Sequence, residues 1–109
     1  MMQRRHTDER AASNFDRVFF ALADPTRRNL LDKLYARDGQ RLRELISDFD
    51  ISRQAVSKHL EVLADTGLIF VRRGECGAPV HFLNRALIRQ VHRGWIEKFL
   101  RVDVRVDCS

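Results

Sequence analysis

Residues 52–63 combine an apolar face with a polar face that could contact nucleic acid. At about 100° per residue, Val56, Leu60 and Leu63 fall together, as residues of a hydrophobic core would. The opposite face and its flank comprise Arg53, Gln54, Ser57, Lys58 and Glu61. Long polar side chains can reach base edges in a major groove, and short hydroxyls allow close approach to phosphate. The same pattern also fits an ordinary solvated helix face. The elements on either side of this helix indicate which interpretation, nucleic-acid contact or solvated surface, is favoured.

His59 falls on the core-flanking side of this helix and not on its outer face. We expect it to pack, or to bond to backbone or phosphate from the edge, and not to read a base. The phosphate alternative keeps it among the candidate DNA contacts. Ala55 is small where two helices must come close, which indicates a structural role.

The segment before residue 52 predicts helices joined by short turns. Asp24 and Pro25 form a start signal, since aspartate caps free amides and proline is tolerated at the first helical position. A short third helix is expected to hold residues 45–49. Ser52 can cap the fourth helix, which should run to the C-terminal glycine Gly67. Because so few residues separate the third and fourth helices, the two should form a helix-turn-helix unit.

A basic hairpin is expected after the fourth helix. Residues 68–71 and 80–83 are β-prone runs on either side of a loop that contains glycine and proline. Arg72 and Arg73 end the first strand, where they could contact phosphate or enter a minor groove. They could also be plain surface arginines. With the capped helix-turn-helix before it, however, a basic wing favours binding to double-stranded DNA.

The first and last helices carry more large apolar side chains than one small domain easily buries. In the last helix, which should begin near Asn84, such residues recur four apart, as in one continuous stripe. We expect a two-fold homodimer through these residues. Some of them must also close the core of the protomer, and the sequence leaves open which ones. The candidate interface residues are Phe15, Phe19, Leu87, Val91, Trp95 and Phe99.

The length of 109 residues fits one domain, which we expect to be mostly α with a small β-hairpin. The prediction is a winged helix-turn-helix over 13–101, with about five helices and a two-stranded wing. A flexible polar arm should precede it at 1–12, and a tail should follow at 102–109. The formal net charge of +5 favours a polyanionic partner. No membrane span, hydrophobic signal core or cysteine framework is apparent, so we expect a cytoplasmic protein.

Two other classes of function fit the sequence less well than DNA binding. An enzyme is disfavoured because the chain has no glycine-rich phosphate loop, nucleophile elbow or metal-hydrolase motif. A winged helix used only for contact with other proteins would be expected to lose the donors of its fourth helix. This chain keeps Gln54, Ser57 and Lys58 and adds a basic wing.

The amino-acid sequence of several segments resembles that of the ArsR/SmtB family of bacterial repressors, over roughly residues 15–100. The matching stretches are ALADPTRR at 21–28, REL at 43–45, ISRQAVSKHL at 51–60 and GLI at 67–69. The resemblance implies a winged-helix homodimer with the first and last helices at its interface. It also implies a repressor of its own operon whose repression is relieved by an effector. A two-fold dimer should bind an operator that is an inverted repeat.

The ligands of the family's metal sensors are missing from this chain. Where one type carries a cysteine pair, this chain has ELISD at 44–48. The last helix offers only His92 and Glu97, five residues apart, which does not place both on one face. We therefore expect no metal site and no cofactor, and the identity of any effector stays open. Cys76 lies near the wing arginines, where a redox role is conceivable and an incidental surface thiol is the simpler interpretation.

Overall fold

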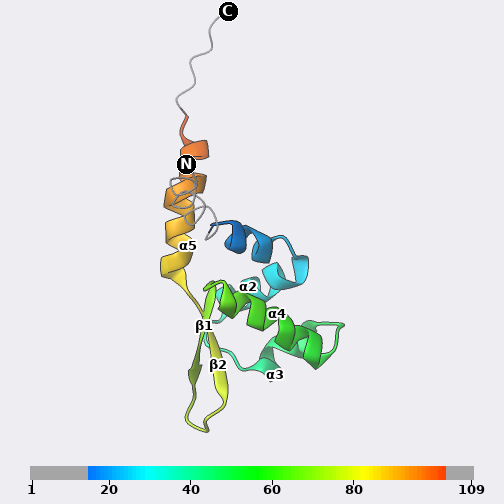
Figure 1. The fold of residues 1–109 in the computed structure, drawn as a ribbon. Helices are drawn as coiled ribbons and strands as arrows, with labels where there is room; N and C mark the ends of the chain where they lie inside the picture. The colour runs from blue at the N-terminus through cyan, green and yellow to red at the C-terminus, as the bar shows by residue number, and fades with distance from the viewer. Residues whose placement is uncertain (1–14, 103–109) are drawn as a thin grey trace, which may run out of the picture.

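The structure, a computed structural model, describes residues 15–102 (Figure 1). Positions 15–22 are helical, and α2 (Pro25–Ala36), α3 (Leu42–Leu45) and α4 (Arg53–Asp65) follow along the chain. A 3-10 turn, η1 (Ile46–Asp48), extends α3. The expected arm at 1–12 and positions 103–109 of the expected tail lie outside the described residues.

An antiparallel hairpin and an interrupted helix complete the chain. Strand β1 (Ile69–Arg73) pairs with β2 (Pro79–Leu83), so that Ile69 lies opposite Leu83 and Arg73 opposite Pro79. The last helix consists of α5 (Arg85–Val91), a π-helical turn η2 (His92–Ile96) and a 3-10 turn η3 (Glu97–Leu100). This is a winged helix-turn-helix, as predicted. One detail differs, because Phe49 follows the third helix and does not lie within it.

The core lies where α2, α3 and α4 meet the base of the hairpin. Leu30 and Leu34 of α2, Leu45 of α3, and Val56 and Leu63 of α4 are each fully buried. Leu30 and Leu34 are four positions apart, and Val56 and Leu63 are seven apart, and both spacings place side chains on one face of a helix. The polar residues of α4 are thereby turned away from the core.

Side chains at the corner between residues 15–22 and α2 form hydrogen bonds to the backbone of both helices. The Asp24 carboxylate accepts from the Arg27 amide at 3.0 Å, and Pro25 is the first residue of α2. The buried Arg27 guanidinium donates to the carbonyls of Phe20 at 3.1 Å and Ala21 at 2.7 Å. Since helix ends leave their last carbonyls unpaired, Arg27 caps one helix while Asp24 caps the next.

The base of the hairpin is fixed to the helix-turn-helix. Gln40, between α2 and α3, exchanges two backbone hydrogen bonds with His81 of β2, at 3.1 and 2.8 Å. The Asp38 carboxylate accepts from the Leu83 amide at 2.9 Å. Gly39 between them has φ +78°, and its face lies against the ring of Phe82. These contacts set the direction in which the wing leaves the body.

The last helix projects away from the body on the side opposite the wing (Figure 1). Val91 is buried, and Leu87 packs on the core next to Gly67. Ile96 still packs on the core, but Trp95, Phe99 and Leu100 are exposed, and Phe99 is 64% exposed. The end of this helix therefore carries apolar surface that the protomer does not bury.

Candidate nucleic-acid interface

The N-terminal turns of α4 present polar side chains to solvent at the positive end of a helix. The Ser52 hydroxyl accepts from the Ala55 amide at 3.1 Å and so starts the helix. Arg53, Gln54 and Lys58 are exposed. The first turn contains no acidic residue, so nothing neutralises the partial positive charge of the free amides there. This end of α4 is suited to an anion such as a phosphate group.

Ser57 lies at the inner edge of α4 and is half-buried. It lines a groove of about 210 Å³ together with Leu42 of α3 and Val71 and His81 of the hairpin. The sequence placed Ser57 on the outer face, but the hairpin and α3 cover that flank. A helical wheel cannot show this cover because it comes from elements outside the helix.

His59 joins α4 to the corner that precedes α2. Its Nδ1 lies 3.3 Å from Nη1 of Arg27 and 3.8 Å from the Asp24 carboxylate. The Arg27 amide donates to that carboxylate and, with His59 nearby, holds the pKa of Asp24 below its ordinary value. The histidine thus packs against polar neighbours, which is the first of the two roles expected for it.

The two wing arginines differ in what holds them. The Arg73 guanidinium donates to the Gly77 carbonyl at 2.7 Å, across the loop. The Arg72 guanidinium lies 5.3 Å from the centroid of the Phe70 ring, which stacks on Phe82 at 5.4 Å. Both arginines are exposed. Arg72 is therefore supported by an aromatic surface on one face of the wing, while Arg73 braces the loop.

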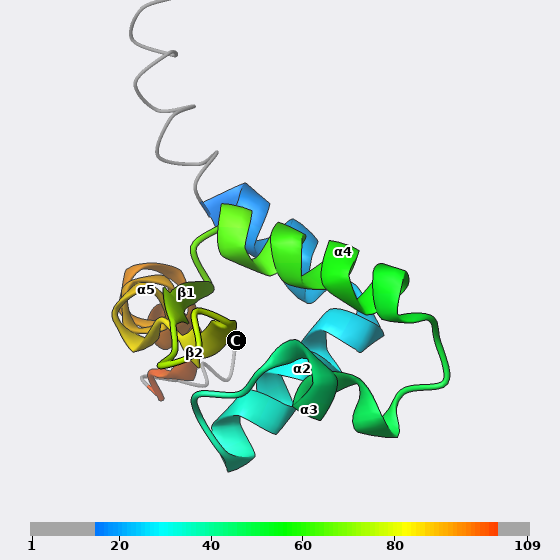
Figure 2. The same cartoon turned by 90° about the horizontal axis from the view of Figure 1, so that it is seen from below.

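Two further exposed or half-exposed cations, at the start of α3 and within it, were missed by the sequence interpretation. Arg41 starts α3, and its guanidinium reaches to 4.0 Å from Sγ of Cys76 in the wing loop. Arg43 is exposed on α3. Figure 2 shows α3 between the hairpin and the loop that leads into α4. The only sequence signal for Arg41 was its charge, because its contact spans 35 positions of the chain.

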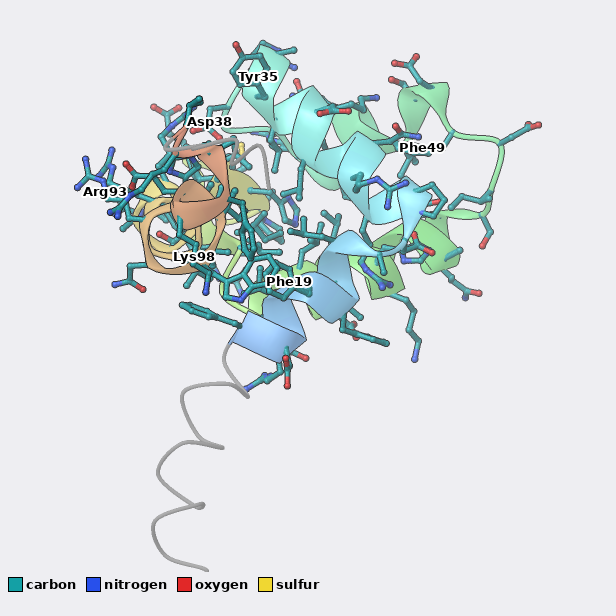
Figure 3. All side chains as sticks on the ribbon, turned by 90° about the horizontal axis from the view of Figure 1, so that it is seen from above. Phe19, Tyr35, Asp38, Phe49, Arg93 and Lys98 are labelled. Atoms are coloured by element: carbon teal, nitrogen blue, oxygen red, sulfur yellow. The ribbon has the colours of Figure 1, made fainter. Side chains whose placement is uncertain are left out.

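The candidate dimer residues fall into two groups. Val91 is buried in the protomer core, and Phe15 and Leu87 contact the protomer's own glycines, Gly94 and Gly67. The remaining three form an aromatic cluster at the end of the molecule, with ring centroids 5.1 Å apart for Phe19–Trp95 and 4.8 Å apart for Trp95–Phe99. In Figure 3, Phe19 lies beside the terminal helix, with Arg93 on the helix's other side.

Metal ligands do not converge in the part of the chain that the structure describes. Over residues 15–102, no group of three or more His, Cys, Asp or Glu side chains could hold an ion. Within the same range, no helix is long and apolar enough to span a bilayer.

Known proteins similar to this chain are helix-turn-helix transcriptional regulators. Residues 22–72 match a family model described as a helix-turn-helix domain. The HTH-type transcriptional regulator YuzN of Bacillus subtilis is 42% identical over 77% of this chain and 97% of its own length. The transcriptional repressor SdpR of the same organism is 30% identical over 76% of this chain and 89% of its own length.

Two solved structures are similar in fold. An ArsR-like transcriptional regulator from Rhodococcus superposes with a TM-score of 0.73 at 27% identity, covering 83% of each chain. The homodimeric winged helix-turn-helix DNA-binding domain Mb0332 of Mycobacterium bovis superposes with a TM-score of 0.63 at 22% identity. That superposition covers 91% of this chain and 95% of the other.

Proposed function

The chain belongs to the ArsR family of winged helix-turn-helix transcriptional regulators, and from that premise we propose that it is a homodimeric repressor of its own operon. The proposed operator is an imperfect inverted repeat in bacterial DNA, bound in the cytoplasm. The observation that carries the proposal is the exposed, uncompensated N-terminal end of α4, with a basic wing on the same part of the protein.

We assign the base-reading role to Gln54 and phosphate contacts to Arg53 and Lys58. An amide side chain can bond to adenine through two atoms at once, whereas a lysine contacts phosphate as a point charge. Arg72 and Arg73 would approach the backbone or the adjacent minor groove from the wing. Ser57 and His59 lie at the edges of α4, and we assign them short contacts to the DNA backbone.

The homodimer is proposed from the aromatic cluster of Phe19, Trp95 and Phe99. Phe99 and Leu100 are 64% and 61% exposed, which a second copy would bury. The homodimeric Mb0332 domain and the repressor SdpR are relatives in fold and sequence that support dimer and repressor respectively. In a two-fold dimer the two α4 helices would meet half-sites about 34 Å apart, or a multiple of that distance.

The DNA-binding test uses two variants with different expected signatures. Lys58→Ala should weaken binding to every sequence and lower the salt slope by about one unit. Gln54→Ala should reduce binding at the operator by about 1–3 kcal/mol and leave random DNA nearly unaffected. Arg93→Ala is the charge-matched control, since Arg93 is exposed on the terminal helix. Gel-shift titrations at two salt concentrations in which both variants behave like the control would contradict the assignment.

The dimer test is sedimentation of the full chain at micromolar concentration. The wild type should sediment as a dimer, and Phe99→Glu should shift it to monomer, because a charge in an apolar interface loses its hydration. A wild-type protein that is only monomeric would contradict the proposed assembly. A footprint without two-fold symmetry would do the same for the operator.

A further inference from the structure

An apolar cavity of about 230 Å³ lies between the body of the protein and its terminal helix. Its walls come from residues 15–22, from α2, from the start of the hairpin, and from α5 with η2. Its exposed lining surface is entirely apolar, and the residues that line it include Leu22, Leu31, Leu68, Ile88, His92 and Ile96. Ile88, at 39% exposed, lies where the cavity opens to solvent.

The cavity coincides with the irregular part of the terminal helix. The Glu97 amide donates to the His92 carbonyl, five positions back, so that η2 is a π-helical turn. Both His92 and Ile96 of this turn line the cavity. π-helical turns are rare and occur often at functional sites, because the extra residue changes which side chains face a given wall.

The shape and chemistry of the cavity select one class of ligand. A dry apolar cavity of about 150 Å³ is known to hold benzene, so this one has room for one substituted or fused ring. A charged or strongly polar molecule would lose its hydration, and no polar atom of the lining residues, His92 included, presents surface to it. The occupant should therefore be a small uncharged hydrocarbon-like molecule.

The cavity is lined by the terminal helix and is joined to α4 through Leu68, so it is linked to both elements on which the proposed DNA binding depends. The Leu68 amide donates to the Leu63 carbonyl at 3.0 Å, which ties this wall to the C-terminal end of α4. The opposite wall belongs to the helix that carries Trp95 and Phe99 into the proposed dimer interface. A molecule between the two walls would change how α4 is held relative to the partner subunit.

We propose that this cavity binds a small uncharged apolar molecule and that its occupation changes the affinity of the dimer for DNA. The second half rests on the proposed function, whereas ligand binding itself does not. Both halves are measurable on the full-length protein.

The binding test titrates toluene and indene into the full-length protein by calorimetry. Saturable binding with one site per chain is expected for at least one of them, and benzoate should not bind. Ile88→Phe, and Leu31→Phe from the opposite wall, should weaken binding tenfold or more by filling the space. Ile51→Phe is the matched control, since Ile51 is an isoleucine of nearly equal exposure, 40%, outside the cavity.

Three results would overturn the site: no saturable binding, equal binding by wild type and Ile88→Phe, or binding only by the monomeric Phe99→Glu variant. The last would mean that a second copy of the chain fills the cavity. Saturating probe should also change wild-type operator affinity about fivefold or more, and binding without that change overturns the effector role. If the protein binds no operator even without probe, the proposed function fails, and the calorimetric result still decides on the site.

Discussion

The paired arginines at the start of α2 allow a sharp test of how burial governs the strength of a hydrogen bond. Arg27 is buried and donates to two carbonyls, those of Phe20 and Ala21. Arg28 is exposed and donates to one, that of Leu22, at 2.7 Å. Both side chains do the same task at the same helix end, so methionine substitutions compare them directly. Methionine keeps most of the aliphatic stem and removes only the donors and the charge.

The expected difference follows from these contacts. A hydrogen bond to a charged group contributes about 1.5–3 kcal/mol net, so the two bonds of Arg27 sum to roughly 3–6 kcal/mol. Carbonyls at a helix end regain some water, which favours the lower limit, about 3 kcal/mol. The exposed bond of Arg28 should contribute about 0.5–1 kcal/mol, as exposed charged contacts do. The difference of about 2 kcal/mol is roughly 30-fold in the unfolding constant.

The assay is urea unfolding followed by circular dichroism at one fixed protein concentration, because the stability of a dimer depends on concentration. Both variants lose one positive charge, so a general charge effect cancels in the comparison. If Arg27→Met is no more destabilising than Arg28→Met, burial is not what makes Arg27 important. The capping argument for this corner would then be refuted.

Three further outcomes are expected. Gly39→Ala should be more destabilising than Gly77→Ala in the same urea assay: both residues have positive φ, which costs about 1–2 kcal/mol in alanine, but only Gly39 would also bring a Cβ to 2.9 Å from the Phe82 ring. Equal losses would contradict the close packing. The folded protein lowers the pKa of Asp24 below its ordinary value of 3.8, so the ionised carboxylate stabilises the fold above pH 3.8. That stabilisation is lost as the pH falls through the lowered pKa, and Asp24→Asn should therefore lose less stability on acidification than the wild type does. Zinc, cadmium, nickel or a chelator should leave operator affinity unchanged at matched ionic strength, and a tenfold loss, about 1.4 kcal/mol, would reveal a metal site.

Local signals predicted the helix boundaries well. Ser52 and Asn84 cap α4 and α5 through their side chains, and Gly67 adopts φ +87° after α4. Each of these features depends on residues at most four positions apart, so the sequence carries it directly. The hairpin was predicted from equally local signals, namely two β-prone runs on either side of a loop with glycine and proline.

Contacts between distant parts of the chain were not predictable in this way. The sequence showed Arg27 only as part of a family motif, yet its side chain contacts His59, 32 positions along the chain. The burial of Val91 and the cover over Ser57 depend on how whole elements pack. The π-helical turn of η2 also left no trace in the apolar spacing, because Trp95 and Phe99 still contact each other.

The wing loop is closed by bonds of its own, and this bears on the entropy of binding. The Gly77 amide donates to Gly74 at 2.9 Å, the Gly74 amide donates to Ala78 at 2.8 Å, and Arg73 bonds to Gly77. Fixing the backbone of one flexible residue costs about 1–2 kcal/mol in conformational entropy. A flexible loop of residues 74–78 would therefore cost several kcal/mol of binding free energy when DNA ordered it. A loop that already holds its shape avoids most of that loss. Mutations that loosen this turn should therefore slow association and weaken affinity without removing a single contact to DNA.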